Sequence, residues 1–230
     1  MNKASIKPVF ADFGTSWTKI FDTATGSRRI IPSSRANLIK VHAATGRNAE
    51  KLASININEL VALARGSARI AGIGKGSMLV LDIGARDMKY VHIKNGSVSR
   101  MDWNGSCGAL TGFTLELLGR HFSLDFGSIE PSDGEIPLTC GVLGMERIFD
   151  KIAGGENPSQ AVAEFVRGLA SLAYAFIEKP RRFHLSGGLC DNPLFLKSFP
   201  PGVEVTPLGR FVLLEGVAAE YESSAPFLSP

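Results

Sequence analysis

The sequence predicts an α/β protein with two lobes, and three of its features support this class. An apolar strand runs into the pattern Asp-x-Gly twice, in DFGTSWTK at residues 12–19 and in DIGARDMK at residues 82–89. Strands and helices alternate in the C-terminal third, which is typical of α/β domains. The glycine-rich break AGIGKGS lies between the two copies, so the lobes are expected at residues 1–76 and 77–230. The last helix of the second lobe is a candidate to pack back on the first lobe.

The first lobe is expected to open with a β-hairpin. PVFADFG at residues 8–14 is a short apolar strand, and WTKIFDTATG at residues 17–26 alternates and ends in a glycine, so it should turn back on the first strand. A polar interval follows. Residues 48–66 then carry apolar side chains at a loosely helical spacing, which predicts a helix: Leu52, Ile55, Leu60 and Leu63.

The second lobe is expected to contain a longer series of strands and helices. The dipeptide Asn95-Gly96 predicts the tip of a hairpin, because both turn residues need positive φ there. Asn157 is a plausible N-cap for a long helix that must end before Pro180. The remaining patterns predict strands at residues 78–84, 181–188 and 203–207, and helices within residues 110–122, 143–154 and 213–223.

Charge and hydropathy argue against two classes of protein, those that bind nucleic acid and those that span a membrane. The net charge of +3 is spread along the chain, with only the doublets Arg28-Arg29 and Arg181-Arg182, so no basic stripe indicates nucleic-acid binding. No apolar run approaches the roughly 18 residues that would span a membrane, and the first residues do not read as a signal peptide. We therefore expect a cytoplasmic protein.

The repeated Asp-x-Gly pattern predicts a phosphate site. Gly14 and Gly84 let the backbone come close to an anion, and the hydroxyls of Thr15 and Ser16 can add hydrogen bonds. An aspartate beside phosphates makes sense if it holds Mg²⁺ or orients an attacking water. One such pattern alone is more often a turn, but two copies in one chain favour a nucleotide site.

Two of the three cysteines share a local pattern. Ser106-Cys107-Gly108 recurs as Thr139-Cys140-Gly141, each before a predicted helix whose N-terminal dipole favours a thiolate. A cysteine metal site normally needs four ligands, and a two-fold dimer supplies the other two. The alternative is that both are small buried apolar residues. Cys190 has no such counterpart and is expected to pack in the interior.

These motifs together resemble a known superfamily, that of acetate and sugar kinases, heat-shock chaperones and actin. Within it the chain is similar to the ATPase activators of 2-hydroxyacyl-CoA dehydratases and to the ATPase subunits of benzoyl-CoA reductase. The likeness rests on an ordered set of motifs: the first hairpin, then HAATGRN, LDIGARD, SCGALTG and LSGGLCDN.

The resemblance implies a two-lobed actin-like (ribonuclease H-like) ATPase fold with duplicated mixed sheets and flanking helices. It implies ATP or ADP with Mg²⁺, and a homodimer that shares one 4Fe-4S cluster through Cys107 and Cys140. The partners implied are a dehydratase-like or benzoyl-CoA reductase-like enzyme and a ferredoxin or flavodoxin as electron donor. The implied catalytic residues are Asp12, Asp82 and Asp87, and the nucleotide-binding residues are Gly14, Thr15, Ser16, Lys19, Gly84, Thr111, Gly112, Gly187, Gly188 and Asn192.

Two departures from the family pattern leave alternatives open. Arg86 stands where the family has an amide, and Leu110 replaces a glycine. A small-molecule kinase would use Asp82 or Asp87 to deprotonate a substrate hydroxyl, and a non-hydrolysing scaffold would bind ATP without turnover. The four histidines are scattered and do not suggest a zinc site or a catalytic triad.

Overall fold

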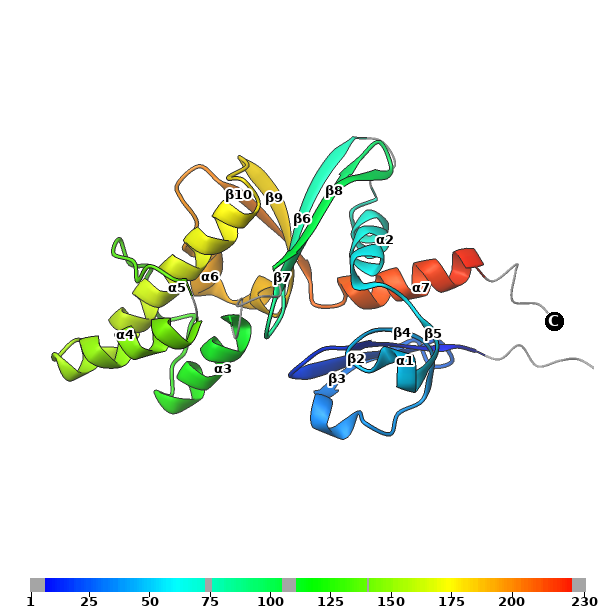
Figure 1. The fold of residues 1–230 in the computed structure, drawn as a ribbon, viewed down its shortest axis with the longest axis horizontal. Coiled ribbons are helices and arrows are strands. Elements are labelled where there is room, and N and C mark those ends of the chain that lie inside the picture. Colours follow the sequence, from blue (N-terminus) through cyan, green and yellow to red (C-terminus); the bar gives the residue numbers. More distant parts are fainter. Residues whose placement is uncertain (1–6, 73–75, 105–110, 140, 225–230) are drawn as a thin grey trace, which may run out of the picture. The chain divides into compact units, whose positions relative to one another are not determined.

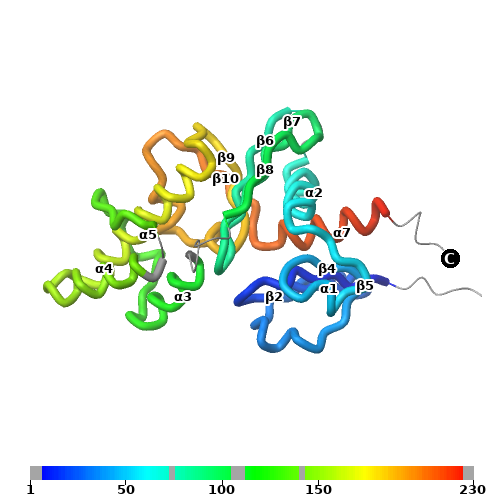
Figure 2. The backbone as a smooth tube through the Cα atoms, in the orientation of Figure 1, coloured from blue at the N-terminus to red at the C-terminus, as the bar shows by residue number. Residues whose placement is uncertain are grey.

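The computed structural model of the chain describes residues 7–72, 76–104, 111–139 and 141–224. The chain divides into two compact units. Unit 1 holds the residues up to Gly76, the short stretch 93–98 and the residues from Phe211 onward, and unit 2 holds residues 77–92 and 99–210. Each unit is built on one five-stranded sheet (Figures 1 and 2).

The sheet of unit 1 has the strand order β3-β2-β1-β4-β5. Its first three strands form an antiparallel meander, while β4 and β5 run parallel to β1 and to β4 respectively. Successive side chains of β1 point to opposite faces of the sheet, and Phe10 to Phe13 are all buried, so both faces of the sheet are covered. The strands are β1 (Val9–Phe13), β2 (Trp17–Asp22), β3 (Ser27–Pro32), β4 (Val41–Gly46) and β5 (Ala53–Asn56).

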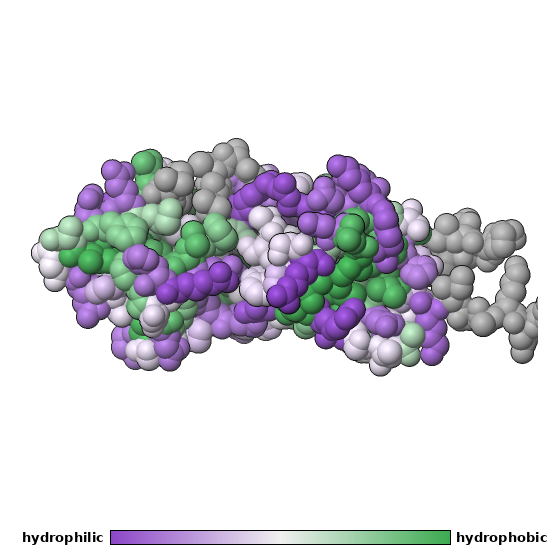
Figure 3. Space-filling model, turned by 90° about the horizontal axis from the view of Figure 1, so that it is seen from below, coloured by the Kyte–Doolittle hydropathy of each residue, from purple (hydrophilic) through white to green (hydrophobic). Residues whose placement is uncertain are grey.

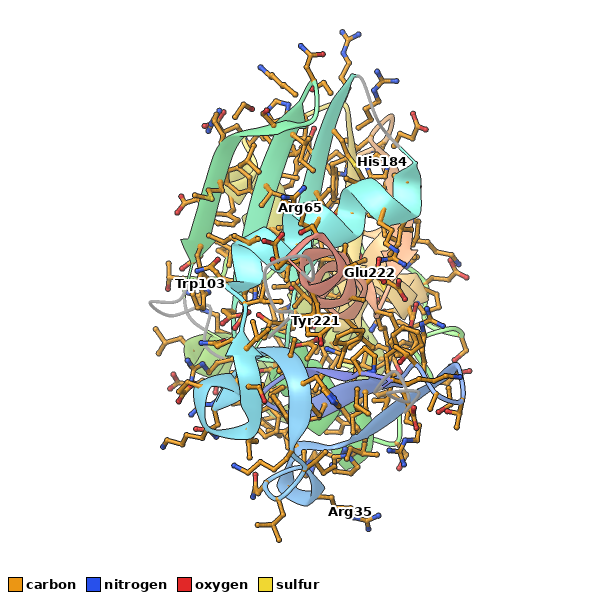
Figure 4. All side chains as sticks on the ribbon, turned by 90° about the vertical axis from the view of Figure 1, so that its right-hand side faces the viewer. Arg35, Arg65, Trp103, His184, Tyr221 and Glu222 are labelled. Carbon is orange, nitrogen blue, oxygen red and sulfur yellow. The ribbon has the colours of Figure 1, made fainter. Side chains whose placement is uncertain are left out.

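Two helices of unit 1 cross at very close range. They are α2 (Glu59–Ala71), capped by the side chain of Asn58, and α7 (Val212–Ser224). A Cβ placed on Gly66 would lie 1.9 Å from the carbonyl oxygen of Val212, so only glycine permits this approach. Arg65 also donates to Glu220 at 3.0 Å (Figure 4 labels Arg65 on α2). The short elements η1 (Ser33–Arg35) and α1 (Ala49–Leu52) complete the unit.

The sheet of unit 2 has the strand order β10-β9-β6-β7-β8, with β9 parallel to both β6 and β10. Its strands are β6 (Ser77–Ile83), β7 (Met88–Lys94), β8 (Ser97–Asn104), β9 (Arg182–Gly187) and β10 (Glu204–Gly209). The helices are α3 (Thr111–His121), α4 (Gly141–Ala153), α5 (Pro158–Phe176), α6 (Pro193–Lys197) and the 3₁₀ turn η2 (Gly188–Asp191). Helix α5 supplies much of the core, because one of its faces is fully buried from Ala161 to Ala173.

The two sheets share one topology. Read from the opposite edge, the second sheet becomes β8-β7-β6-β9-β10, in which each strand corresponds to one of β3-β2-β1-β4-β5. In both units a three-strand meander is followed by two parallel strands. The predicted fold class is therefore confirmed: two mixed sheets with flanking helices form an actin-like ATPase fold.

Most of the predicted elements are present, but the helix expected within residues 48–66 is wrong as a single element. The chain forms α1, then strand β5 and then α2, because Ile55 pairs with Ala43 of β4 instead of joining a helical face. The polar interval, for which the sequence predicted no element, contains β3 and β4. None of the described helices is long and apolar enough to cross a membrane.

Candidate nucleotide site

In unit 1 the aspartate of the first Asp-x-Gly pattern is paired with a lysine. Asp12 on β1 lies opposite Lys19 on β2, and Lys19 Nζ donates to Asp12 Oδ2 at 2.8 Å. The Asp12 side chain is 3% exposed and that of Lys19 is 15% exposed. The ammonium group therefore balances the charge of a buried carboxylate, and Lys19 is already engaged by the protein.

The neighbouring parallel strand adds a hydroxyl and a glycine to this pair. Thr45 on β4 is in register with Asp12, and its buried Oγ1 has no hydrogen-bond partner among the described residues. Gly46 follows in register with Phe13 at φ +89°, and a Cβ there would lie 2.4 Å from the Phe13 carbonyl oxygen. The motif HAATGRN contains Thr45 and Gly46, but neither residue is among the site residues predicted from the sequence. The available signal was the Ala-Thr-Gly triplet at the end of a strand.

The predicted phosphate residues Gly14, Thr15 and Ser16 form the turn between β1 and β2. A Cβ on Gly14 would lie 2.5 Å from the carbonyl oxygen of Trp17, so this turn requires glycine. The carbonyl of Ser16 accepts from the Ser33 backbone N–H at 2.9 Å, which fixes the turn against η1. Thr15 is exposed.

Unit 2 contains an equivalent arrangement around the second pattern. Asp82 on β6 is buried and accepts a hydrogen bond from the hydroxyl of Ser186, its register partner on β9. Lys89 Nζ lies 3.7 Å from Asp82 Oδ2 and 3.4 Å from Asp87 Oδ1. One buried ammonium group thus faces two carboxylates, which leaves a net negative charge in this set.

A glycine at the end of β9 in unit 2 corresponds to Gly46 at the end of β4 in unit 1. Gly187 follows Ser186 in register with Ile83, has φ +89°, and a Cβ there would lie 2.3 Å from the Ile83 carbonyl oxygen. This repeats the geometry of Gly46 in unit 1. Each unit therefore brings together an aspartate, a lysine, a hydroxyl and a tightly packed glycine at the ends of two parallel strands, where α/β proteins commonly bind ligands.

Four further residues of unit 2 are predicted to bind the nucleotide. Thr111 and Gly112 lie at the start of α3, and Gly188 and Asn192 lie at the start of η2 and at the N-cap of α6. Gly112, at the start of α3, packs against the turn after β6, because a Cβ there would lie 2.7 Å from the Gly84 carbonyl oxygen. Thr111 begins the same helix. Gly188 has open space around it, whereas the Asn192 side chain accepts from Phe195 N and caps α6. The structure thus brings Gly112 to Gly84, while the side-chain oxygen of Asn192 is used inside the protein.

The two predicted cluster ligands, Cys107 and Cys140, lie outside the described residues. Among the residues that the structure does describe, no group of three or more histidine, cysteine or acidic side chains forms a metal site. Cys190 is buried within η2. Its burial, with Asp191 nearby, raises the pKa of the thiol to about 12. The inward packing predicted for Cys190 agrees with this position.

The paired sheets of one topology define the class of fold, which is actin-like. No protein-family model matches the chain. It is 26% identical over 157 residues to the (R)-2-hydroxyglutaryl-CoA dehydratase activating ATPase of Acidaminococcus fermentans, a match covering 64% of this chain and 59% of that relative. The chain is thus similar to a dehydratase activator, as the motifs predicted.

Two solved structures share the fold over nearly the whole chain. One is (R)-2-hydroxyglutaryl-CoA dehydratase component A from A. fermentans, with a TM-score of 0.78, 21% identity, and coverage of 96% of this chain and 100% of that one. The other is the activator of the 2-hydroxyisocaproyl-CoA dehydratase from Clostridium difficile with bound ADPNP, with a TM-score of 0.75, 19% identity, and coverage of 98% and 99%. At these identities the structural likeness establishes the fold.

Proposed function

We propose that the chain is an ATP-hydrolysing activator that works as a homodimer and passes an electron to a 2-hydroxyacyl-CoA dehydratase-like or benzoyl-CoA reductase-like enzyme. The observation that carries the proposal is the duplicated set of aspartate, lysine, hydroxyl and glycine at equivalent strand ends. The similarity to a dehydratase activating ATPase gives the proposal its direction.

The residues of both sets suit a nucleotide with Mg²⁺. Carboxylate oxygens are the ligands that Mg²⁺ prefers, and Asp12, Asp82 and Asp87 supply them. Gly14 and Gly84 allow the backbone amides to approach phosphate oxygens. The buried Thr45 hydroxyl, which has no partner among the described residues, fits a hydrogen bond to a ligand or to a water that the ligand orders.

The two sets differ in charge, and we assign them different roles. In unit 1 one lysine balances one aspartate, so we assign Asp12 to positioning. In unit 2 two carboxylates share Lys89, so Asp82 or Asp87 can hold the divalent cation or orient the attacking water. The Asp87 side chain, 17% exposed against 4% for Asp82, is the more accessible of these two carboxylates. In the reaction, water forms a new bond to the γ-phosphorus while the bond to the bridging oxygen breaks and ADP leaves.

Cys107 and Cys140 are proposed to hold one 4Fe-4S cluster together with the same two residues of a second subunit. When bound, the cluster would supply the one-electron chemistry. In the sequence Cys140 directly precedes α4, and Cys107 lies four positions before Thr111, the first residue of α3. Both helices also expose apolar side chains, Leu117, Leu143 and Phe149, and Figure 3 shows hydrophobic residues at the surface over this part of unit 2. Such a surface supports an interface with another subunit or enzyme.

ATP turnover by the purified protein tests the nucleotide half of the proposal. Asp82→Asn and Asp87→Asn should each reduce kcat by about 100-fold or more, while ADPNP affinity stays within a few-fold of the wild type. Asp133→Asn is the matched control, because Asp133 is exposed and remote in sequence from both patterns. Unchanged turnover in both site variants would contradict the assignment. ADPNP binding without any wild-type turnover would select the scaffold alternative.

A further inference from the structure

Strand β8 forms an exposed edge of the sheet in unit 2. It is the last strand in the order β10-β9-β6-β7-β8, so one side of its backbone has no neighbouring strand among the described residues. Every residue of β8 from Ser97 to Trp103 is exposed. Figure 4 draws β8 as the outermost strand of this sheet, with Trp103 labelled toward its C-terminal end. Such an edge presents backbone N–H and C=O groups with which a further strand can pair.

The other edges of the two described sheets carry features that hinder such pairing. Strand β5 has only four residues, and β10 contains Pro207 with a register shift beside it. Strand β3 carries Arg28 and Arg29 and ends at Pro32. Short strands, prolines, bulges and charges all discourage pairing between sheet edges. Strand β8 has eight residues and contains neither proline nor glycine, so it lacks most of these features.

Strand β8 also carries large apolar side chains at the surface. Val98, Met101 and Trp103 are 44%, 58% and 45% exposed, and among the described strands only β8 has large apolar side chains in the exposed class. Successive side chains of a strand point to opposite faces, so Met101 and Trp103 share one face and Val98 lies on the other. A strand added to this edge would therefore cover apolar surface on both faces of the sheet.

The charged side chains of β8 are arranged symmetrically on the two sides of Met101. Arg100 precedes this residue and Asp102 follows it, and both lie on the face opposite to Met101. Nη1 and Nη2 of Arg100 both donate to Glu178, and Nη2 also donates to the Tyr90 hydroxyl at 3.1 Å. These contacts order the guanidinium group, which has five N–H donors in all, so donors remain for a carboxylate of another chain.

We propose that β8 pairs with β8 of a second copy of this chain, antiparallel, around a two-fold axis that passes between the two copies of Met101. In this register Arg100 of each copy lies opposite Asp102 of the other, and Ser99 lies opposite Trp103. Opposite charges that face each other across two strands stabilise the pairing, and like charges destabilise it. An axis at Arg100 or at Asp102 would place like charges opposite each other, so the charge pattern selects Met101 as the centre and a second copy as the occupant.

This interface is separate from the shared cluster proposed at Cys107 and Cys140, and it does not depend on the proposed function. A symmetric contact of this kind uses the same surface on both subunits. A chain with both interfaces would join two cluster-sharing dimers into a larger assembly.

Disulfide cross-linking of the full chain tests the register. Met101→Cys and Ser99→Cys are each made in a chain that also carries Cys107→Ser and Cys140→Ser, which removes the proposed cluster ligands. Directly opposed side chains have Cβ atoms about 5 Å apart, so Met101→Cys should give a disulfide-linked dimer under mild oxidation. The two copies of position 99 would lie roughly 13 Å apart along the strands, so Ser99→Cys should remain monomeric on a non-reducing gel.

Sedimentation equilibrium in the same Cys107→Ser/Cys140→Ser parent measures the contribution of the charges. Asp102→Arg places like charges opposite each other in both charge pairs, and it should weaken self-association by about 10-fold. Glu204→Arg is the matched control, because it makes the same change of charge at an exposed position on β10, at the opposite edge of the same sheet. This control should associate as the parent chain does.

Three results would overturn the proposal. They are a parent chain that stays monomeric at every concentration, equal cross-linking of Met101→Cys and Ser99→Cys, and unchanged association of Asp102→Arg. The first result would mean that the charges of β8 protect this edge from pairing. Because the parent chain lacks the proposed cluster ligands, none of these results bears on the proposed electron transfer, and a failure of that function would leave the β8 interface standing.

Discussion

In each unit a lysine on one strand of the first hairpin lies beside the aspartate on the other strand: Lys19 beside Asp12, and Lys89 beside Asp82. Removing one member of such a pair should destabilise the fold. Lys19 is engaged by Asp12 at 2.8 Å, and Lys89 lies near both Asp82 and Asp87. Breaking a buried ion pair by removing one partner leaves the other charge buried and unpaired. The resemblance implies that Lys19 binds the nucleotide, and in the structure its ammonium group pairs with the Asp12 carboxylate.

Replacing Lys19 by alanine should therefore destabilise the fold. We expect a loss of about 3 kcal/mol in the free energy of unfolding, because Asp12 stays buried without its partner. Lys94→Ala, at an exposed position on β7, should change the stability by less than about 0.5 kcal/mol. Denaturant unfolding of both variants measures this difference. If Lys19→Ala keeps wild-type stability and loses only ADPNP affinity, Lys19 is a phosphate ligand and the pairing role is wrong.

Cys190 should be chemically inert in the folded protein. Burial, followed by the nearby Asp191, raises the pKa of this thiol to about 12, so it stays protonated at pH 8. Because the folded-state pKa lies above the unfolded value, this thiol contributes stability below about pH 9 that is lost as pH rises toward 12. Peptide mapping after iodoacetamide treatment at pH 8 should find Cys190 unmodified without denaturant and modified in guanidinium. Rapid alkylation of the native protein would contradict its burial.

At the scale of elements, the crossing of α2 and α7 depends on two glycines. A Cβ on Gly66 would lie 1.9 Å from the Val212 carbonyl oxygen, and one on Gly216 would lie 1.8 Å from that of Ala62. Both contacts involve backbone atoms, which cannot rotate away. The helices would have to separate, and α7 would lose packing on the strands beneath it.

Gly66→Ala should accordingly lower the free energy of unfolding by about 2 kcal/mol or more. Gly154→Ala is the control, because a Cβ there would meet only backbone oxygens at 3.3 and 3.5 Å, just after α4 ends. The control should be neutral or slightly stabilising. Thermal unfolding followed by circular dichroism compares the two variants. Equal melting temperatures for Gly66→Ala and wild type would mean that the helices do not approach this closely.

The elements that could be predicted are those with a strong local signal. Asn95 and Gly96 adopt φ values of 50° and 79°, as the hairpin turn required, and Asn157 caps α5 through Ser159 N. Residues 53–56 were assigned to a helix because their apolar spacing is ambiguous over so short a run. Pairing with β4 decided the outcome, and that interaction lies outside any local window.

At the scale of the whole molecule, the chain folds as two units with one topology. The repeated Asp-x-Gly pattern predicted the two copies, and it placed Asp12, Gly14, Asp82 and Gly84 at strand ends. It did not reveal Thr45 or Gly46, because these residues join the set only through the parallel pairing of β1 with β4. A local motif therefore predicts the site residues that lie on its own strand. The site residues on the neighbouring strand can be identified only once the pairing of the two strands is known.

The most direct test of the proposed electron-transfer function is iron and sulfide analysis after anaerobic purification. We predict about four irons and four sulfides per dimer in the wild type and in Cys190→Ser, and a loss of both in Cys107→Ser and Cys140→Ser. Cys190 is the matched control, because it is a buried cysteine outside the proposed ligand set. A wild-type protein without iron, or Cys107→Ser and Cys140→Ser variants that keep the full content, would contradict a cluster shared between two subunits.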